Sequence, residues 1–391
     1  MHAPQTSLQP DAYITGLIRD YYSKCRIHAP ERVESREFGV GTFERKIIKR
    51  HISFRDESAI QAYLSENAPA YVSYSTAYYR FPAGRPMETK GWTGSELVFD
   101  LDVDDIDPKN LACGARHGRS WVCADCLDGV KSETLKLIEE FLIPDFGFSE
   151  REIAVNFSGN RGYHVHVGKD SITQLGPEAR KEISDYISGN GLSIDEFFPE
   201  AARGARLTGP RPDEKGWKGR IARKFISTMN KGPDALMALG ADKSVANNIY
   251  RKRALIEMGI NSGNWDMVYI KNKSEFWKSV LGNEAIAQSD RIDGNVTKDI
   301  SHLIRLPDTV HGGTGLVAKR IASVSALAAF DPMASALAFT EGEMEINAES
   351  GNELVIGNKT FGPYKGEKAV LPIYAGVYLY LKGLASITTI T

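Results

Sequence analysis

Two aspartates, Asp100 and Asp102, stand two positions apart in the apolar run Leu97–Val103. Successive side chains of a strand alternate faces, so a strand here would project both carboxylates from one side, roughly 6.6 Å apart. Such a pair repels itself unless a cation lies between its members, and hard oxygen ligands favour Mg²⁺ or Mn²⁺. Two such ions suit phosphoryl or nucleotidyl transfer. The alternative is an acidic strand end, continued by residues 104–107, that faces water.

A second group of residues forms the pattern C-x3-H-x5-C-x2-C: Cys113, His117, Cys123 and Cys126. Three thiolates and one imidazole fill the tetrahedral shell of Zn²⁺ and leave no open position. The pattern therefore predicts a structural zinc site and not a catalytic one. The chain has only four cysteines, too few to staple its 391 residues by disulfides, which indicates a reducing compartment.

A glycine-containing turn at residues 158–162 separates two apolar segments, 152–157 and 163–167, and predicts a β-hairpin. Its two glycines let the backbone approach a ligand closely. Its candidate donors to phosphate oxygens are a hydroxyl, a guanidinium and two imidazoles: Ser158, Arg161, His164 and His166. The hairpin is thus a candidate triphosphate-binding element. The alternative is a polar surface turn.

A third element begins with Arg291-Ile292-Asp293, which adds another carboxylate. Downstream, His311 opens the glycine-dense loop 311–316. Such a loop suits close contact with a nucleotide, although a turn between a strand and a helix would look the same locally.

These residues need elements to position them, and hydrophobic periodicity predicts both helices and strands. Helices are expected at residues 11–24, 59–64, 132–141, 177–188 and 244–257. Strands are expected at residues 97–103, 152–157 and 163–167. Strands and helices alternate in the first 170 residues and again near the C-terminus, which predicts an α/β core interrupted by insertions. Residues 371–380 favour either a packed C-terminal helix or an interaction face.

Composition excludes several classes of protein. With 42% hydrophobic and 25% charged residues, the chain is not mainly disordered, collagen-like or a disulfide scaffold. A polar N-terminus without a signal-peptide core, and the lack of a long uninterrupted apolar window, predict a soluble intracellular protein.

Net charge gives no general sign of nucleic-acid binding. The 48 Lys and Arg residues against 50 Asp and Glu give −2, so binding would have to come from local patches. The basic segment 203–224, with Trp217 inside it, could contact a template backbone. A solvated charged surface is the alternative.

Taken in order, these motifs resemble the catalytic small subunit of archaeal and eukaryotic-type DNA primase, and the archaeal branch is the closer match. The resemblance spans roughly Arg36 to Leu316. It is carried by Tyr78-Tyr79-Arg80, Lys90-Gly91-Trp92, the acidic run from Phe99 to Asp105, Ser158-Gly159-x-Arg161-Gly162-x-His164, Arg291-Ile292-Asp293 and the segment from Leu306-Pro307 to Leu316.

The resemblance implies an α/β (α+β) fold: a primase-type core of mixed β-sheets flanked by helices, with a zinc knuckle and a helical insertion. Residues 1–170 would form the first part of the catalytic core, with the knuckle at 113–126. Residues 171–260 would form the insertion. Residues 261–391 would complete the core and add C-terminal helices.

The resemblance also implies roles for single residues. Asp100, Asp102 and Asp293 would bind the catalytic Mg²⁺ or Mn²⁺ ions. The nucleotide would be bound by residues from the hairpin and the glycine-dense loop: Ser158, Arg161, His164 and His311. The knuckle of Cys113, His117, Cys123 and Cys126 would hold Zn²⁺. Many members of the family have Lys at the position of Gly313 and an aromatic residue near His166. Because that Lys is missing here, His311 and backbone amides would make more of the contacts to the triphosphate.

The implied activity is synthesis of short RNA primers, with DNA primers as a further option, on single-stranded DNA from nucleoside triphosphates by two-metal transfer. A primase large subunit is the implied partner, in a cytoplasmic, nucleoid-associated complex. Alternatives are a related repair or end-joining polymerase that extends existing primers, a zinc-bearing nucleic-acid-binding module without chemistry, and a metal-dependent phosphohydrolase or nuclease. The sequence leaves open the sugar preference, product length, preferred metal and large-subunit interface.

Overall fold

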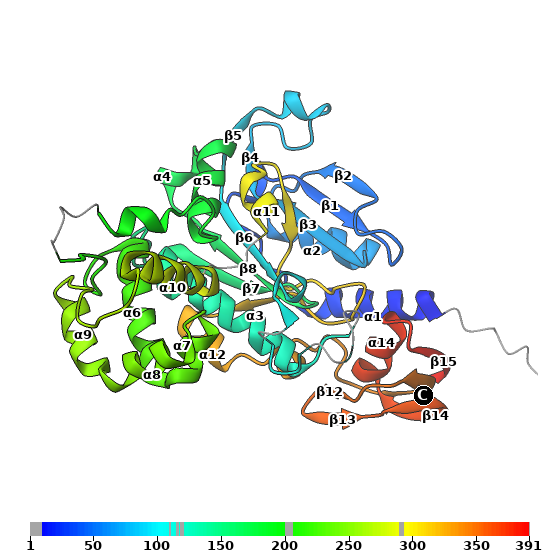
Figure 1. The fold of residues 1–391 in the computed structure, drawn as a ribbon. Coiled ribbons are helices and arrows are strands. Elements are labelled where there is room, and N and C mark those ends of the chain that lie inside the picture. The colour runs from blue at the N-terminus through cyan, green and yellow to red at the C-terminus, as the bar shows by residue number, and fades with distance from the viewer. Residues whose placement is uncertain are drawn as a thin grey trace, which may run out of the picture. The chain divides into compact units, whose positions relative to one another are not determined.

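The chain folds into helices and several antiparallel sheets, seen in a computed structural model (Figure 1). The structure describes residues 10–108, 111–114, 117, 121–199, 206–288 and 293–390. Two compact units are present: residues 1–135, 150–181 and 292–391 form the first, and residues 136–149 and 182–291 form the second. The predicted α/β class is confirmed. The predicted boundaries at residues 170 and 260 separate a catalytic core from an insertion. They stay a prediction, because the two compact units are defined by packing and not by function.

The first unit begins with two helices that pack together, α1 (Pro10–Lys24) and α2 (Glu57–Asn67), as predicted. The buried residues of α1 repeat every four positions, which places them on one face: Ile14, Ile18 and Tyr22. Asp56 caps α2 by accepting a hydrogen bond from the Ala59 amide. The neighbouring sheet has the order β2-β1-β3-β9, with bounds Lys49–Ile52, Phe38–Gly41, Tyr71–Ser75 and Leu303–Arg305.

A second sheet carries the aspartates and the hairpin, in the order β10-β7-β8-β6. Its strands are β10 (Lys319–Ile321), β7 (Ile153–Phe157), β8 (Gly162–Val167) and β6 (Leu97–Asp102). The predicted hairpin is confirmed as the antiparallel pair β7–β8, and β6 joins its far side (Figure 1). The strand predicted to reach Val103 ends at Asp102, because a 3₁₀ turn begins at the next residue.

Short elements of the first unit connect these sheets: β4 (Ala77–Tyr79), β5 (Trp92–Ser95), α4 (Asp170–Thr173) and α11 (Gly294–Lys298). Helix α3 (Ala124–Lys136) begins earlier than predicted and continues into a π-helical turn, Leu137–Leu142. The predicted helix at 177–188 is confirmed as α5 (Pro177–Ile187). Single 3₁₀ turns complete the chain path: Val33–Ser35, Met87–Lys90, Val103–Asp105, Glu150–Glu152 and Ile194–Phe197.

The C-terminal part of the first unit adds a third sheet, β14-β11-β15, and a two-stranded ribbon, β12-β13. Their bounds are β11 (Glu343–Ser350), β12 (Leu354–Ile356), β13 (Lys359–Phe361), β14 (Tyr364–Pro372) and β15 (Ala385–Ile390). The helices are α12 (Val324–Ala329), α13 (Pro332–Ser335) and α14 (Ile373–Leu381). Most of α14 is buried, so the segment at 371–380 is a packed helix.

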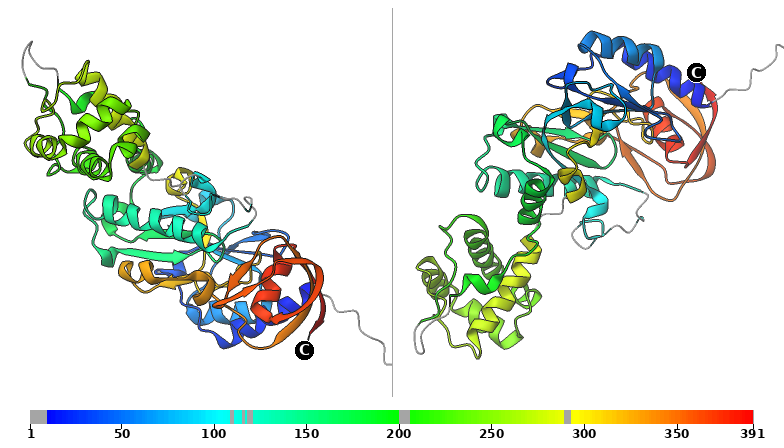
Figure 2. Two further views of the ribbon diagram at one scale, coloured as in Figure 1. Left: turned by 60° about the horizontal axis from the view of Figure 1, so that its bottom comes forward. Right: turned by 90° about the horizontal axis from the view of Figure 1, so that it is seen from above.

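The second unit is helical: α6 (Gly216–Lys231), α7 (Pro233–Ala238), α8 (Lys243–Arg251), α9 (Arg253–Asn261) and α10 (Lys273–Gln288), drawn in green to yellow-green in Figure 2. The single helix predicted at 244–257 is wrong, because the chain breaks at Lys252. The break lets the buried face of α8 pack on α7 and that of α9 on α6. None of the described helices is both long and apolar enough to span a bilayer.

Candidate active site

Strand β6 presents Asp100 and Asp102 as the sequence predicted. Its apolar side chains are buried, whereas these two side chains keep 29% and 33% of their surface exposed. The strand lies at the edge of its sheet. The structure thus holds two carboxylates at the boundary of a hydrophobic core, where solvent screens their charges only partly.

Asp293 joins this pair from far along the chain. Its amide donates a hydrogen bond to the Asp100 carbonyl at 3.0 Å, which fixes the two backbones side by side. Its side chain caps α11 by accepting from the Asn295 amide at 2.9 Å. The structure therefore brings together the three aspartates assigned by resemblance. Arg291 and Ile292, which precede Asp293 in the motif, lie outside the described residues.

The electrostatics of the cluster favour a cation. Burial, and then the negative charges of Asp102 and Asp293, raise the pKa of Asp100 to about 7. Burial also raises the pKa of Asp102, although Arg161 opposes this. A carboxylate cluster that resists its own ionisation gains most when a divalent cation enters, because the cation removes both the repulsion and part of the desolvation penalty.

The hairpin turn lies against the same strand. Across the β6–β8 pair, Gly162 is so close that an added Cβ would stand 2.3 Å from the Leu101 carbonyl oxygen. Only glycine fits there. The Ser158 hydroxyl oxygen accepts from the amides of Asn160 and Gly162 at 3.3 and 3.2 Å, so this side chain holds the turn in shape.

Arg161 extends from that turn to the acidic strand. Its Nε lies 3.2 Å from Asp102 Oδ1, and its Nη2 lies 2.5 Å from Asp104 Oδ2. The guanidinium is only 26% exposed, so these contacts are partly shielded from water. The predicted phosphate-binding cation therefore lies within reach of the predicted metal ligands.

His164 lies directly opposite Asp100 in the β6–β8 register, with Nε2 3.5 Å from Asp100 Oδ1. Burial lowers the pKa of His164 well below its usual value, so the imidazole is neutral at pH 7. The same row of the sheet continues through Asn156 on β7 to Arg320 on β10. Sequence reasoning missed these last two, because strand order was not available to it.

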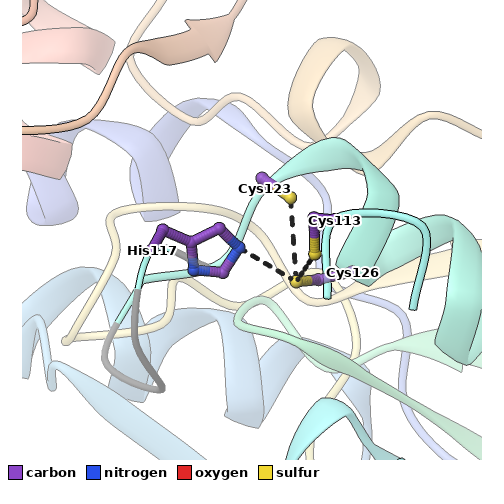
Figure 3. A group of neighbouring side chains, drawn as sticks. All are labelled: Cys113, His117, Cys123 and Cys126. Carbon is purple, nitrogen blue, oxygen red and sulfur yellow. Dashed lines mark hydrogen bonds between the residues drawn. The ribbon is translucent and has the colours of Figure 1, made fainter. Parts of the chain in front are cut away.

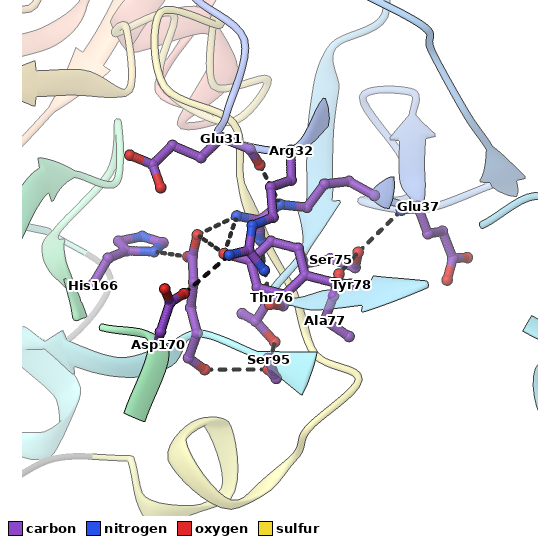
Figure 4. A network of polar contacts seen from close by, with 12 residues as sticks. Glu31, Arg32, Glu37, Ser75, Thr76, Ala77, Tyr78, Ser95, His166 and Asp170 are labelled. Carbon is purple, nitrogen blue, oxygen red and sulfur yellow. Dashed lines mark hydrogen bonds and ion pairs between the residues drawn. The ribbon is translucent and has the colours of Figure 1, made fainter. Parts of the chain in front are cut away.

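His166, two residues further along β8 and on the same face as His164, is fixed by a buried polar network (Figure 4). Its Nδ1 lies 2.9 Å from Glu96 Oε2, and the other oxygen of Glu96 pairs with Arg36. Arg36 also donates to the Ser75 carbonyl and to the Tyr78 hydroxyl. Although burial raises it, Arg36 and His166 together lower the pKa of Glu96 to about 2. This network, which sequence analysis did not find, fixes the end of β8 beside the strand that carries the aspartates.

The loop 311–316 closes on the hairpin. Thr314 Oγ1 donates to the Gly159 carbonyl at 2.6 Å, and an added Cβ on Gly159 would stand 2.9 Å from His311 Cβ. Burial lowers the pKa of His311 well below its usual value. Because its Nδ1 accepts from the Gly313 amide at 3.2 Å, the neutral ring carries its proton on Nε2 and can donate there.

The predicted metal cluster is assembled as expected, at the start of α3 (Figure 3). The ligand atoms of Cys113, His117, Cys123 and Cys126 all lie within 4.8 Å of one another. Cys126 Sγ lies 3.5 Å from Cys113 Sγ and 3.7 Å from Cys123 Sγ. Zn–S bonds of about 2.3 Å in a tetrahedron place two sulfurs roughly 3.8 Å apart, so these separations fit.

The basic segment 203–224 is partly exposed and partly buried: Arg206, Arg211, Lys215 and Arg223 are exposed, so the template contact stays a prediction. Arg203 lies outside the described residues. Trp217 is buried, and Arg220 stacks over it and pairs with Asp145. Lys224 pairs with Glu140. These side chains stabilise the second unit.

Three neighbouring aspartates with a guanidinium and neutral imidazoles beside them are typical of metal-dependent nucleotidyltransferases. The closed Cys/His cluster is a separate feature at the start of α3. A family model described as DNA primase small subunit matches residues 99–323. The chain is also similar to proteins named DNA primase small subunit PriS. That of Methanothrix thermoacetophila is 34% identical, across 96% of this chain and 98% of the relative.

Two further relatives extend the similarity. The PriS of Methanococcoides burtonii is 32% identical, across 97% of this chain and 98% of the relative. The PriS of Nitrosopumilus maritimus is 30% identical, across 92% and 94%. The chain belongs to the DNA primase small subunit family, and the resemblance inferred from its motifs is confirmed.

Proposed function

We propose that this chain joins ribonucleotides, or deoxyribonucleotides, into short primers on a single-stranded DNA template. One observation carries the proposal: Asp293 is hydrogen-bonded to Asp100 on the strand that also carries Asp102. Arg161 lies against Asp102 and His164 lies against Asp100. Family membership supports it. Nucleotidyl transfer needs groups that hold a triphosphate beside groups that hold metal, and this arrangement supplies both kinds.

Asp100, Asp102 and Asp293 would hold two Mg²⁺ or Mn²⁺ ions. The donor set fits, because all three side chains offer hard oxygen ligands. The raised pKa of Asp100 also indicates an unfavourable excess of negative charge, which a bound cation would neutralise. Bound there, such ions lower the pKa of the attacking 3′-hydroxyl and neutralise charge on the triphosphate.

The remaining groups would bind and orient the nucleotide. Arg161 now pairs with Asp102 and Asp104, and a triphosphate would offer it stronger acceptors in place of Asp104. Neutral His311 would donate from Nε2 to a phosphate oxygen, and His164 would orient Asp100 and the nucleotide. Ser158 would act by fixing the turn that carries Arg161.

The cluster of Cys113, His117, Cys123 and Cys126 would hold a structural Zn²⁺. Burial raises the pKa of Cys126 to about 12, so without a metal this thiol stays protonated. Zinc binding would replace the thiol protons and tie the loop to the start of α3.

Template binding would depend on a partner. The net charge of −2 gives the chain no overall attraction for DNA, and the exposed Lys and Arg residues of the second unit, such as Arg211, Lys215 and Arg223, would contribute only a local basic surface. We therefore propose a heterodimer with a primase large subunit that supplies most of the affinity for single-stranded DNA. The predicted insertion at 171–260 would act outside the chemistry, since the described site residues all lie in the first unit.

The test is synthesis on unprimed single-stranded DNA with labelled nucleotides and Mg²⁺ or Mn²⁺, with and without the large subunit. Wild type would be compared with Asp100→Asn, Asp102→Asn and the matched control Asp170→Asn, whose side chain is 92% exposed outside the site. We expect metal-dependent short products from wild type and the control only.

Two results would overturn the proposal. Extension of added primers without synthesis on bare template would indicate a repair polymerase. Nucleic-acid binding that is unchanged in both active-site variants, without any synthesis by wild type, would indicate a binding module without chemistry.

A further inference from the structure

We propose that Lys382, at the C-terminal end of α14, is a triphosphate-binding residue of the nucleotide site. The inference rests on the proposed function and deepens it, because it adds a cation from a segment in which sequence analysis found no site residue. The match to the family model ends at residue 323, well before this lysine.

The position of Lys382 is fixed by the packing of α14. An added Cβ on Gly315 would stand 2.8 Å from Val377 Cγ1, so the helix lies directly on the glycine-dense loop. The Lys382 amide donates to the Tyr378 carbonyl at 3.1 Å and closes the last turn. Gly383 follows with φ +72°, the left-handed conformation that ends a helix and that glycine adopts most easily.

The side chain of Lys382 reaches the hairpin. Its Nζ donates to Asn160 Oδ1 at 3.3 Å, and the ammonium lies over the Tyr378 ring at 5.6 Å. Its charge acts on Arg161 and Asp102. It also acts on His311, so one lysine lies within electrostatic reach of the hairpin, the acidic strand and the loop.

The charge of Lys382 has no direct ion pair among the described residues, although the negative charge of Asp102 acts on it. Within the described part of the chain it pairs with no carboxylate, and its acceptor there is a neutral amide. Burial, and then the positive charge of Arg161, lower the pKa of Lys382. Although Arg161 is paired with Asp102 and Asp104, its charge still repels that of Lys382, and a multiply charged anion that contacts both cations would offset this repulsion.

The shared chemistry of such an anion is phosphate, and two sources are available: the triphosphate of the incoming nucleotide and the backbone of the template. The triphosphate is the better match, because Lys382 and Arg161 flank the turn beside Asp102, a proposed metal ligand. The loop 311–316 itself contains no Lys or Arg, and Gly313 has no side chain to offer. Lys382 supplies the cation that this loop lacks.

The experiment uses the full chain with its large subunit on unprimed template. Lys382→Met keeps the aliphatic stem against Tyr378 and removes the charge, Lys382→Arg keeps the charge, and Lys365→Ala removes an exposed lysine elsewhere in the C-terminal part. The measurements are the KM for nucleotide, kcat, the Kd for single-stranded DNA, the inhibition constant of pyrophosphate and the Tm.

For Lys382→Met we expect about a tenfold higher KM and a similarly weaker inhibition by pyrophosphate. The Kd for DNA and the Tm should stay at the wild-type values. Lys382→Arg should recover most of the loss, and Lys365→Ala should match wild type. If Lys382→Met instead fails to fold, the same losses in a folded Lys382→Gln variant support the proposal.

Three results would overturn the inference. One is a KM within twofold of wild type in the charge-removing variants. Another is a loss of DNA affinity as large as the change in KM, which would assign the lysine to the template. The third is an equal loss in Lys382→Arg, which would indicate a structural role. If the wild-type enzyme makes no product from any template, the proposed function itself is contradicted, which is a different outcome from failure of the Lys382 inference.

Discussion

The cysteine cluster and the aspartate cluster both gather groups that call for a cation, but they are assembled in different ways. The four ligands of the first lie within one loop and the helix that follows it. The second joins β6 to Asp293, almost two hundred residues away, through a backbone hydrogen bond. Without metal the thiol of Cys126 is neutral, because its pKa is raised to about 12. The carboxylate of Asp102, by contrast, is paired with the positively charged Arg161.

The clusters differ in how many coordination positions each leaves open on its metal ion. Three thiolates and an imidazole complete a tetrahedron, so nothing else can approach the ion. Three carboxylates satisfy only part of the six or more positions around hard cations, which leaves room for water and phosphate oxygens. The closed set is suited to stability, and the open set is suited to chemistry.

Neutralising one aspartate should have the largest effect, and it tests whether the aspartate cluster serves catalysis and not stability. Asp293→Asn should lower primer synthesis by about a thousandfold or more, since it removes a charged metal ligand from the reacting centre. The Tm should be equal to or above that of wild type, because the change also removes repulsion from Asp100. Turnover and thermal unfolding of the same preparation check both. A marked fall in Tm would show that the acidic cluster is part of the structural framework.

The opposite result is expected for the zinc cluster. Cys126→Ser should lower the free energy of unfolding by about 3 kcal/mol or more, because it removes a buried ligand of a structural metal. Cys25→Ser, at a half-buried cysteine outside the cluster, serves as the matched control. Denaturant unfolding and zinc content measure the effect. Unchanged stability together with lost synthesis would place zinc in the chemistry instead.

The two clusters also differ in how far sequence reasoning could find them. Ligand spacing alone predicted the zinc cluster, because its residues are close neighbours along the chain. Asp100 and Asp102 were predicted from strand alternation, and burial confirmed their strand. Asp293 was noticed as a further carboxylate, but its grouping with Asp100 and Asp102 came only from the resemblance, since nothing near it in sequence indicates the hydrogen bond to Asp100.

Sequence analysis could not predict residues whose roles depend on tertiary packing. Glu96 contacts both His166 and Arg36, which lie 70 and 60 residues away from it along the chain, and no local pattern joins the three. Lys382 follows a helix that sequence analysis could not distinguish from an interaction face. The break at Lys252 was missed for a related reason: periodicity continues across it, and only the partners of α8 and α9 require it.

A smaller change sharpens the description of the open site. Arg161→Lys should raise the KM for nucleotide by about tenfold, because lysine keeps the charge and loses the planar pair of donors that now reach Asp102 and Asp104. Zinc content and Tm should not change. Arg151→Lys, at an exposed arginine on the same unit, is the control. Steady-state kinetics at saturating template measure the shift, and a KM within twofold of wild type would contradict the role.

The smallest expected effect is the pH dependence of metal binding. The folded chain holds the pKa of Asp100 at about 7, above its usual value. The folded state therefore binds this proton more tightly than the unfolded state, so the metal-free protein loses stability as pH rises from about 4 through 7. A divalent cation competes with that proton. The rise in Tm caused by Mg²⁺ should consequently be larger at pH 8 than at pH 6, by a few degrees.

Asp100→Asn is the control for that measurement, because it removes the titrating group. Its response to Mg²⁺ should be small and the same at both pH values. The cysteine cluster offers a contrast within the same molecule, because burial raises the pKa of Cys123 and raises that of Cys126 to about 12. If the Mg²⁺ effect on wild type were also independent of pH, the proton on Asp100 would not compete with metal, and the open site would be organised around Asp102 and Asp293 instead.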